Sequence, residues 1–139
     1  ENLVRNGTAV SVARPTGGEL VIRAAFILTT KRYPDGSSKR KARYVARGDL
    51  QVEGKHFKET HSAVGRSMTL RFLLALAVTK GAVLGQFDIT SAFLNGDIDV
   101  KGLFVQIPPG FGKPGQVWEL KKALYGLKQA PRCWNRTFN

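Results

Sequence analysis

The stretch that decides the fold runs Gln86-Phe87-Asp88-Ile89-Thr90-Ser91-Ala92-Phe93-Leu94-Asn95-Gly96. An acidic residue closes a short apolar run, and a small-aromatic-apolar triplet leading to Asn-Gly follows it. The pattern predicts a buried strand over residues 83–89 that carries Asp88 near its end, and then a helical turn over residues 90–94. A buried carboxylate needs a cation or a metal ion as a partner. Asp88 is therefore the first candidate for a functional residue.

Two runs before this stretch predict a β-hairpin. Residues 20–30 are apolar and β-branched, and residues 39–46 alternate basic with small or apolar side chains. Between them, residues 33–38 read Tyr-Pro-Asp-Gly-Ser-Ser, which is a strong turn signal. Because strand side chains alternate between faces, we expect Lys41 and Arg43 on one face of the hairpin.

The clearest helix is predicted over residues 67–81. Ser67 is a plausible N-cap, Gly81 supplies the stop, and the apolar stripe consists of Leu70, Leu73, Leu74, Ala77 and Val78. Further strands are predicted over residues 103–107 and 117–120, and a last helix begins at Pro131. Residues 1–18 are poor in pattern and are expected to be loose. This order of elements predicts an α+β fold and not a doubly wound parallel sheet.

Composition favours a folded domain with a polyanionic partner. Of 139 residues, 42% are hydrophobic and 9% aromatic, which is enough for a packed core. Lys and Arg total 22 against 10 acids, for a net charge of +12. Seven basic residues lie between positions 31 and 47, and six between 113 and 136, which favours nucleic acid or a nucleotide as partner. A single such cluster would indicate only a solvated surface.

Several other site classes are not favoured. The longest apolar run, residues 72–78, is too short to span a membrane, which takes roughly 20 residues. Cys133 has no Cys or His at ligand spacing, so it is interpreted as a small apolar residue in a reducing compartment. No role in metal binding is expected for His56 or His61. Asp97 and Asp99 are expected to be solvated. Neither a Gly-Lys-Ser/Thr phosphate loop nor a Gly-x-Ser-x-Gly nucleophile elbow occurs in the sequence.

A second motif lies downstream of the stretch around Asp88. The segment Leu124-Tyr125-Gly126-Leu127-Lys128-Gln129-Ala130-Pro131-Arg132 continues through Cys133-Trp134. Together with the stretch around Asp88, it makes the chain resemble the reverse transcriptase of copia-type retrotransposons, closely so over residues 41–134. The resemblance implies part of a right-hand polymerase. It comprises a leader over residues 1–18, fingers with a β-hairpin over 19–66, and over 67–139 the start of the palm with a fingers insertion. The palm is expected to have an antiparallel sheet and packed helices.

The resemblance also implies a role for each candidate residue. Asp88, with the backbone carbonyl of Ile89, would bind the two Mg²⁺ (or Mn²⁺) ions of the family. Phe93 would exclude a ribonucleotide's 2′-hydroxyl. The remaining substrate-binding candidates would grip the triphosphate or line the nucleotide and template path, and they are Lys31, Lys41, Arg43, Tyr125, Gly126 and Lys128. Which of Lys39, Arg40, Lys41 and Arg43 contacts phosphate depends on the strand register, and alternation favours Lys41 with Arg43.

The implied activity is RNA-directed DNA synthesis, in which deoxynucleotides are added to a primer 3′ end. The implied partners are an RNA template, a DNA primer, deoxynucleoside triphosphates and the remainder of the Pol polyprotein, with no membrane. The implied location is intracellular, in a cytoplasmic virus-like particle, with the nucleus left open as a second place.

Departures from the family pattern leave two alternatives open. The family's Tyr-x-Asp-Asp motif does not occur, and plain residues, Ala24 and Ala25, stand where the family usually carries aromatic ones. Glu1 is not Met and the last helix has no terminator, so both ends are expected to be interrupted. One alternative is a non-catalytic, basic nucleic-acid-binding remnant of a degenerate transposon copy. The other is a basic structural module whose similarity is ancestral.

Overall fold

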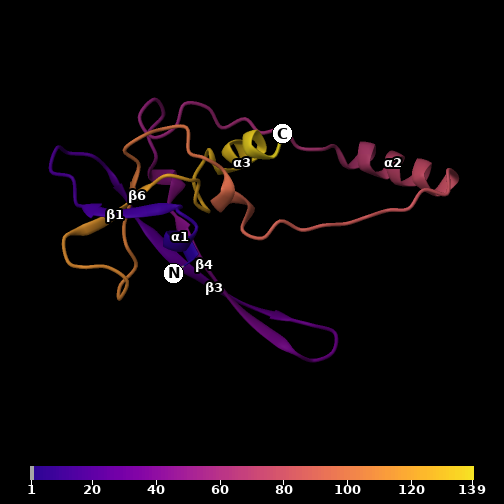
Figure 1. The fold of residues 1–139 in the computed structure, drawn as a ribbon, viewed down its shortest axis with the longest axis horizontal. Coiled ribbons are helices and arrows are strands. Elements are labelled where there is room, and N and C mark those ends of the chain that lie inside the picture. Colours follow the sequence, from indigo (N-terminus) through magenta and orange to yellow (C-terminus); the bar gives the residue numbers. More distant parts are fainter. Residues whose placement is uncertain (1) are drawn as a thin grey trace.

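Two short β-sheets and three helices make up the fold of the computed structural model, which describes residues 2–139 (Figure 1). It is an α+β fold, as the sequence predicts. In chain order the elements are α1 (Asn2–Arg5), β1 (Ala9–Ala13), β2 (Val21–Ile22), β3 (Ala24–Arg32), β4 (Ser38–Ala46), the 3-10 helix η1 (Gly48–Leu50), α2 (Ser67–Thr79), the 3-10 helix η2 (Ala92–Asn95), β5 (Phe104–Val105), β6 (Gln116–Leu120) and α3 (Ala130–Phe138).

The core lies around a four-stranded sheet in the order β1-β6-β5-β2. Strand β6 pairs antiparallel with β1 and β5, but β2 pairs parallel with β5, so the sheet is mixed and the prediction of an antiparallel sheet is wrong for this pair. Because β6 is flanked on both sides, its apolar side chains are buried together with those of the segment that follows it. The fully buried side chains include Ile22, Leu103, Val105, Val117, Leu120 and Leu124.

Strand β1 corrects one expectation. Residues 1–18 are predicted to be loose, but Ala9–Ala13 pairs with all of β6, and Thr8 and Ala9 are buried. The Thr8 carbonyl also accepts hydrogen bonds from the backbone of Lys121 and Lys122. The stretch has no strong local pattern because an edge strand this short gains its order from the neighbouring strand.

The predicted hairpin is confirmed as β3 and β4, which pair antiparallel from Ala24 with Ala46 to Arg32 with Ser38. In the turn, Asp35 accepts hydrogen bonds from the backbone and the hydroxyl of Ser37. The base of the hairpin is buried through Tyr44 and Ala46, whereas residues 25–43 are exposed. The hairpin therefore projects from the body of the molecule (Figure 1).

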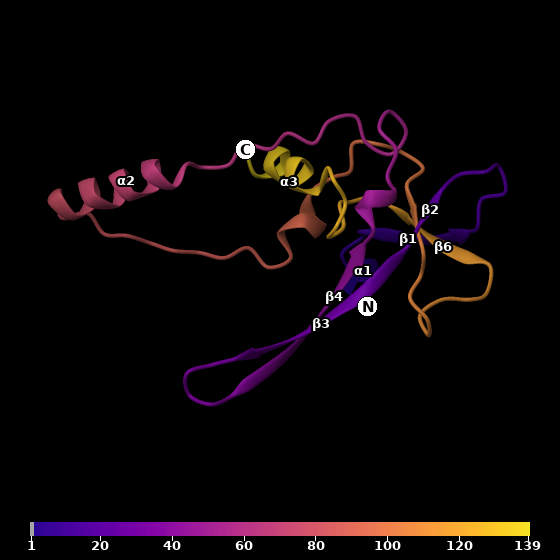
Figure 2. The same cartoon turned by 180° about the vertical axis from the view of Figure 1, so that it is seen from behind.

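Helix α2 forms where the sequence predicts it, but two details differ. Arg66 is the N-cap and Ser67 the first helical residue, so Ser67 makes no side-chain cap. The predicted apolar stripe packs against nothing among the described residues, since Leu70, Leu73 and Leu74 are all exposed. A helix satisfies its hydrogen bonds internally and can form without burial, whereas the burial of its stripe needs a partner surface. Figures 1 and 2 both show α2 standing apart on two extended segments.

The predicted strand over residues 83–89 is wrong. The segment has no strand partner, and Val83 and Phe87 are 97% and 77% exposed. A strand, unlike a helix, exists only when a neighbouring edge accepts its hydrogen bonds, and no described strand lies beside this segment. The predicted strand over 103–107 shortens to β5, while β6 extends the predicted strand 117–120 by one residue. Among the described residues, no helix has both the length and the apolar character needed to cross a membrane.

Helix α3 confirms the prediction of a helix that admits Pro131 in its first turn. It packs on η2, which confirms the predicted helical turn after Asp88. Gly96, at the end of η2, permits this contact, because a Cβ there would lie 2.7 Å from the Trp134 nitrogen. The position of η2, and with it the end of the Asp88 segment, is thus set by α3.

Candidate functional site

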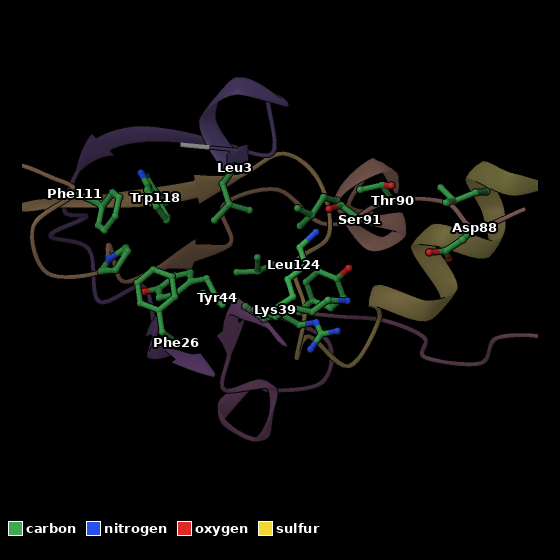
Figure 3. Close-up of a pocket in the computed structure, with 17 residues that line it drawn as sticks. Leu3, Phe26, Lys39, Tyr44, Asp88, Thr90, Ser91, Phe111, Trp118 and Leu124 are labelled. Carbon is green, nitrogen blue, oxygen red and sulfur yellow. The ribbon is translucent and has the colours of Figure 1, made fainter. Parts of the chain in front are cut away.

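A pocket of about 1060 Å³ is lined by residues of β4, by the segment that begins at Asp88 and by Leu124 and Tyr125 (Figure 3). Its walls bring together five of the predicted site residues, which are Lys41, Arg43, Asp88, Ile89 and Tyr125. Lys31, Phe93, Gly126 and Lys128 do not line it. The pocket therefore joins the basic hairpin, the segment around Asp88 and the second motif, which are far apart in the sequence.

Asp88 lies at one end of this pocket, beside α3 (Figure 3). Its side chain is exposed, so the carboxylate needs no buried partner, contrary to the expectation from the sequence. The carboxylate and the neighbouring Ile89 carbonyl are hard oxygen donors of the kind Mg²⁺ prefers. These two oxygen donors can supply only part of a metal site. The described residues contain no group of three or more His, Cys, Asp or Glu side chains that could hold a metal ion.

The chain turns sharply between Asp88 and Phe93. Ser91 has a φ of 56°, and it is the one non-glycine residue with positive φ in the described part of the chain. Its carbonyl accepts the backbone N–H of Leu94 at 2.8 Å, which closes η2. The turn carries Phe93 toward the second motif, where its ring meets that of Tyr125 at 5.2 Å and 63°. The structure thus places the predicted sugar gate against another predicted pocket residue.

The register of the hairpin assigns its basic residues to faces. Lys39 lies opposite Lys31, Lys41 opposite Thr29 and Arg43 opposite Ile27. Paired residues share a face, so Lys31, Lys39, Lys41 and Arg43 lie on one face and Arg40 on the other. Lys39, Lys41 and Arg43 line the pocket, whereas the Lys31 ammonium lies 4.9 Å from the centre of the Tyr33 ring near the hairpin tip.

Gly126 contacts the chain itself. Its φ is +88°, and a Cβ would lie 2.1 Å from the Ala46 carbonyl oxygen and 2.6 Å from Val45 Cγ1. The backbone N–H of Ala46 donates to the Tyr125 carbonyl at 2.8 Å. Gly126 is predicted to let the backbone approach a nucleotide or template closely. In the structure it lets the second motif pack closely against the end of β4 instead.

Lys128 points toward the loop after η1. Its ammonium lies 5.0 Å from the centre of the Phe57 ring and 3.5 Å from the Gln51 carbonyl oxygen. Its backbone N–H donates to Gln51 Oε1 at 2.8 Å. Lys128, which the resemblance places at the template, therefore lies outside the pocket.

A buried polar network beneath Lys128 has no signal in the sequence. Gln51 Nε2 donates to Gln129 Oε1 at 2.9 Å, and Gln129 Nε2 donates to the His56 carbonyl at 2.8 Å. His56 Nδ1 accepts the backbone N–H of Val52, so His56 is a structural residue. The network attaches the second motif to the loop that follows the hairpin.

Arg132 is a second residue whose role the sequence does not reveal. Its guanidinium forms ion pairs with Asp99 and Glu59, each at 2.8 Å. The Asp99 side chain is only 12% exposed, so the expectation that it is solvated is wrong. Burial, with help from the Asp99 charge, raises the pKa of the adjacent Cys133 thiol, which fits its interpretation as a packing residue. Arg132 thereby secures the loop after η2 to α3.

Comparison with known proteins gives the same assignment from the sequence. The family described as reverse transcriptase (RNA-dependent DNA polymerase) matches residues 8–139. The chain is 39% identical over 135 residues to the Retrovirus-related Pol polyprotein from transposon RE1 of Arabidopsis thaliana, covering 94% of this chain and 9% of that protein. It is 36% identical over 143 residues to the Retrovirus-related Pol polyprotein from transposon TNT 1-94 of Nicotiana tabacum, covering 100% and 11%.

The similarity extends to yeast. The Transposon Ty1-DR4 Gag-Pol polyprotein of Saccharomyces cerevisiae is 38% identical over 117 residues, which is 84% of this chain and 7% of that protein. The chain thus spans about a tenth of the length of these curated relatives. No solved structure matches it.

Proposed function

Because this chain belongs to the reverse transcriptase (RNA-dependent DNA polymerase) family of copia-type Pol polyproteins, we propose that it forms the fingers and the start of the palm of such an enzyme. The reaction is RNA-directed DNA synthesis. The primer 3′-hydroxyl oxygen attacks the α-phosphorus of a deoxynucleoside triphosphate, and the bond to the pyrophosphate leaving group breaks. One observation carries the proposal, namely the pocket that joins Asp88 and Ile89 to Lys41 and Arg43.

In the proposed enzyme, some of these residues neutralise charge and others position the nucleotide. Lys41 and Arg43 offset the negative charge of the triphosphate, and the planar guanidinium of Arg43 suits two phosphate oxygens at once. The Asp88 carboxylate and the Ile89 carbonyl would hold Mg²⁺ (or Mn²⁺), which when bound supplies stabilisation of the charge that develops at the α-phosphate. The Tyr125 ring lines the pocket, and the Phe93 ring, which does not line it but packs against Tyr125 at 5.2 Å, is the proposed gate for the nucleotide sugar.

The partners follow from this reaction. They are an RNA template, a DNA primer, deoxynucleoside triphosphates and the remainder of the Pol polyprotein. The proposed location is a virus-like particle in the cytoplasm, with the nucleus as a second place.

The test is primer extension by a chimera. Residues 8–139 replace the matching segment of the transposon RE1 polyprotein, and extension is measured on an RNA template with deoxynucleotides and Mg²⁺. Asp88→Asn should lower extension by roughly 100-fold or more, because the metal site loses a ligand. Asp97→Asn is the matched control, since Asp97 is exposed and lies outside the pocket. Equal extension by the two variants would contradict the proposed role of Asp88.

A non-catalytic, basic nucleic-acid-binding protein is the second candidate. It is favoured by the isolated Asp88, since the described residues offer no group of three metal-binding side chains. An inactive chimera, together with binding of single-stranded RNA that weakens steeply with salt, would support this candidate. A chain that does not bind RNA even at low ionic strength would instead support a basic structural module.

A further inference from the structure

Asp88 lines two cavities. It lines the large pocket together with Lys41 and Arg43, and it also lines a smaller cavity of about 250 Å³. The walls of the smaller cavity come from the segment around Asp88 and from two aromatic residues of α3, Trp134 and Phe138. Helix α3 therefore lies directly beside the candidate metal ligand, as Figure 3 also shows.

Helix α3 is anchored to the body of the molecule without the help of Asp88. Its buried face carries Ala130 and Cys133, which are only 1% and 2% exposed. The Arg132 guanidinium pairs with Asp99 and with Glu59, each at 2.8 Å. The helix is thus a fixed surface against which a neighbouring segment can pack.

Trp134 is the best-held aromatic residue on this surface. Its backbone nitrogen would lie 2.7 Å from a Cβ at Gly96, so the helix and the end of η2 are in close contact at this residue. The Trp134 side chain is half-buried, and its ring centre lies 5.5 Å from that of Phe138. Phe138, in contrast, is 55% exposed and is the last residue of α3.

The segment that carries Asp88 has little support of its own. No described strand lies beside residues 83–89, and Phe87 and Asp88 are exposed. The first buried side chain after α2 is that of Leu94 in η2. A metal-binding side chain must be held within about 0.5 Å of its working position, which needs neighbours that are themselves fixed. Helix α3 supplies such neighbours beside Asp88.

We propose that Trp134 is a positioning residue for Asp88. Its indole packs against the segment around Asp88 and keeps the carboxylate at the end of the pocket that Lys41 and Arg43 line. Trp134 does not itself line that pocket, so it acts through Asp88 and not on the metal ion or the nucleotide. The inference rests on the proposed function and adds the residue that fixes the metal ligand.

The experiment measures Mn²⁺ binding to the transposon RE1 chimera without nucleotide, by electron paramagnetic resonance of the free ion. Asp88→Asn first identifies which bound ions depend on the Asp88 carboxylate. For these ions, Trp134→Ala should raise the Kd roughly 10-fold or more, as the loss of a residue that orients a metal ligand does. Trp134→Phe keeps a ring against the segment and should bind Mn²⁺ nearly as the wild type does.

The matched control is Cys133→Ala. Cys133 is the neighbouring residue of α3, and its buried side chain lies outside the smaller cavity, so its loss weakens the packing of the helix without removing a contact to Asp88. Cys133→Ala should leave the Kd unchanged. The titration reports the number of sites separately from the Kd, so a misfolded fraction lowers the first and not the second. If Trp134→Ala binds no Mn²⁺ at all, Trp134→Leu, which keeps an apolar side chain on α3, takes its place with the same expected rise in Kd.

Two results would overturn the positioning role. One is an unchanged Kd in Trp134→Ala or Trp134→Leu, which would make Trp134 a packing residue of α3. The other is an equal rise in Trp134→Ala and Cys133→Ala, which would show a general loosening of the helix. Both leave the proposed function standing as long as Asp88→Asn removes bound Mn²⁺ and primer extension. Mn²⁺ binding that is indifferent to Asp88→Asn would instead remove the metal site itself.

Discussion

Phe93 is the residue on which sugar selectivity should depend. Its ring packs against Tyr125 at 5.2 Å, five residues beyond Asp88. In the proposed binding mode, this ring would occupy the space that the 2′-hydroxyl of a ribonucleotide needs. In the chimera, Phe93→Ala should accept ribonucleotides more readily and keep some deoxynucleotide incorporation. Asp88→Ala should abolish both activities. The measurement is the ratio of kcat/KM for the two nucleotide types.

The contact with Tyr125 also provides a control for Phe93. Tyr125→Phe keeps the neighbouring ring and should leave the ratio unchanged. Because Phe93 also packs against the core, its loss could act through folding alone. A Phe93→Ala enzyme with less activity and an unchanged ratio would identify Phe93 as a core residue.

The buried hydroxyl of Tyr44 should make the stability of the folded chain depend on pH at high pH. Burial raises its pKa from 10.0 to about 12, and its hydroxyl donates to the Gln106 carbonyl. Because the folded-state pKa lies above the unfolded value, this contribution to stability is complete below pH 10 and is lost as the pH rises toward 12. Denaturant midpoints measured across this range should fall less steeply in Tyr44→Phe. If the midpoints fall equally steeply with pH in the wild type and in Tyr44→Phe, Tyr44 is not the source of this pH dependence.

At the scale of elements, Gly126 joins the second motif to β4. Gly126→Ala should destabilise the chain by about 2 kcal/mol or more, because it combines a positive φ with a Cβ 2.1 Å from the Ala46 carbonyl oxygen. Gly85→Ala is the matched control, since a Cβ there meets nothing within 4 Å. The free energies of unfolding of both variants test this prediction. Equal free energies of unfolding for Gly126→Ala and Gly85→Ala would show that the close contact between the second motif and β4 contributes little to stability.

Elements with a local cause are the ones the sequence predicts well. The turn around Asp35 and Gly36 defines the hairpin, and Pro131 marks the first turn of α3. The segment 83–89 carries an equally clear apolar pattern and forms no strand. The difference is physical, because a hairpin brings its own partner strand and a single strand does not.

For the molecule as a whole, we expect no measurable polymerase activity from the 139-residue chain alone. Two-metal catalysis needs more than one carboxylate, and among the described residues Asp88 has no acidic partner that could complete a metal-binding group. Primer extension on an RNA template with deoxynucleotides and Mg²⁺ tests this. Extension that disappears in Asp88→Asn would show that the chain is sufficient for catalysis.

The sequence by itself determined the family, the α+β class, the hairpin, the helices α2 and α3, and Asp88 as the leading candidate. These follow from short-range signals, such as turn residues, capping positions and motif strings. The sequence predicted the lining of the pocket only in part. Five of the predicted site residues line it, namely Lys41, Arg43, Asp88, Ile89 and Tyr125. Four others do not, namely Lys31, Phe93, Gly126 and Lys128.

Only the tertiary structure decided what each residue faces. It assigned Gly126 to the Ala46 backbone, Arg132 to Asp99 and Glu59, and Phe26 and Phe111 to one aromatic cluster. It also left the stripe of α2 exposed. The reason is that local conformation depends on neighbours in the chain, whereas burial, ion pairing and ring contacts depend on segments that meet only after folding.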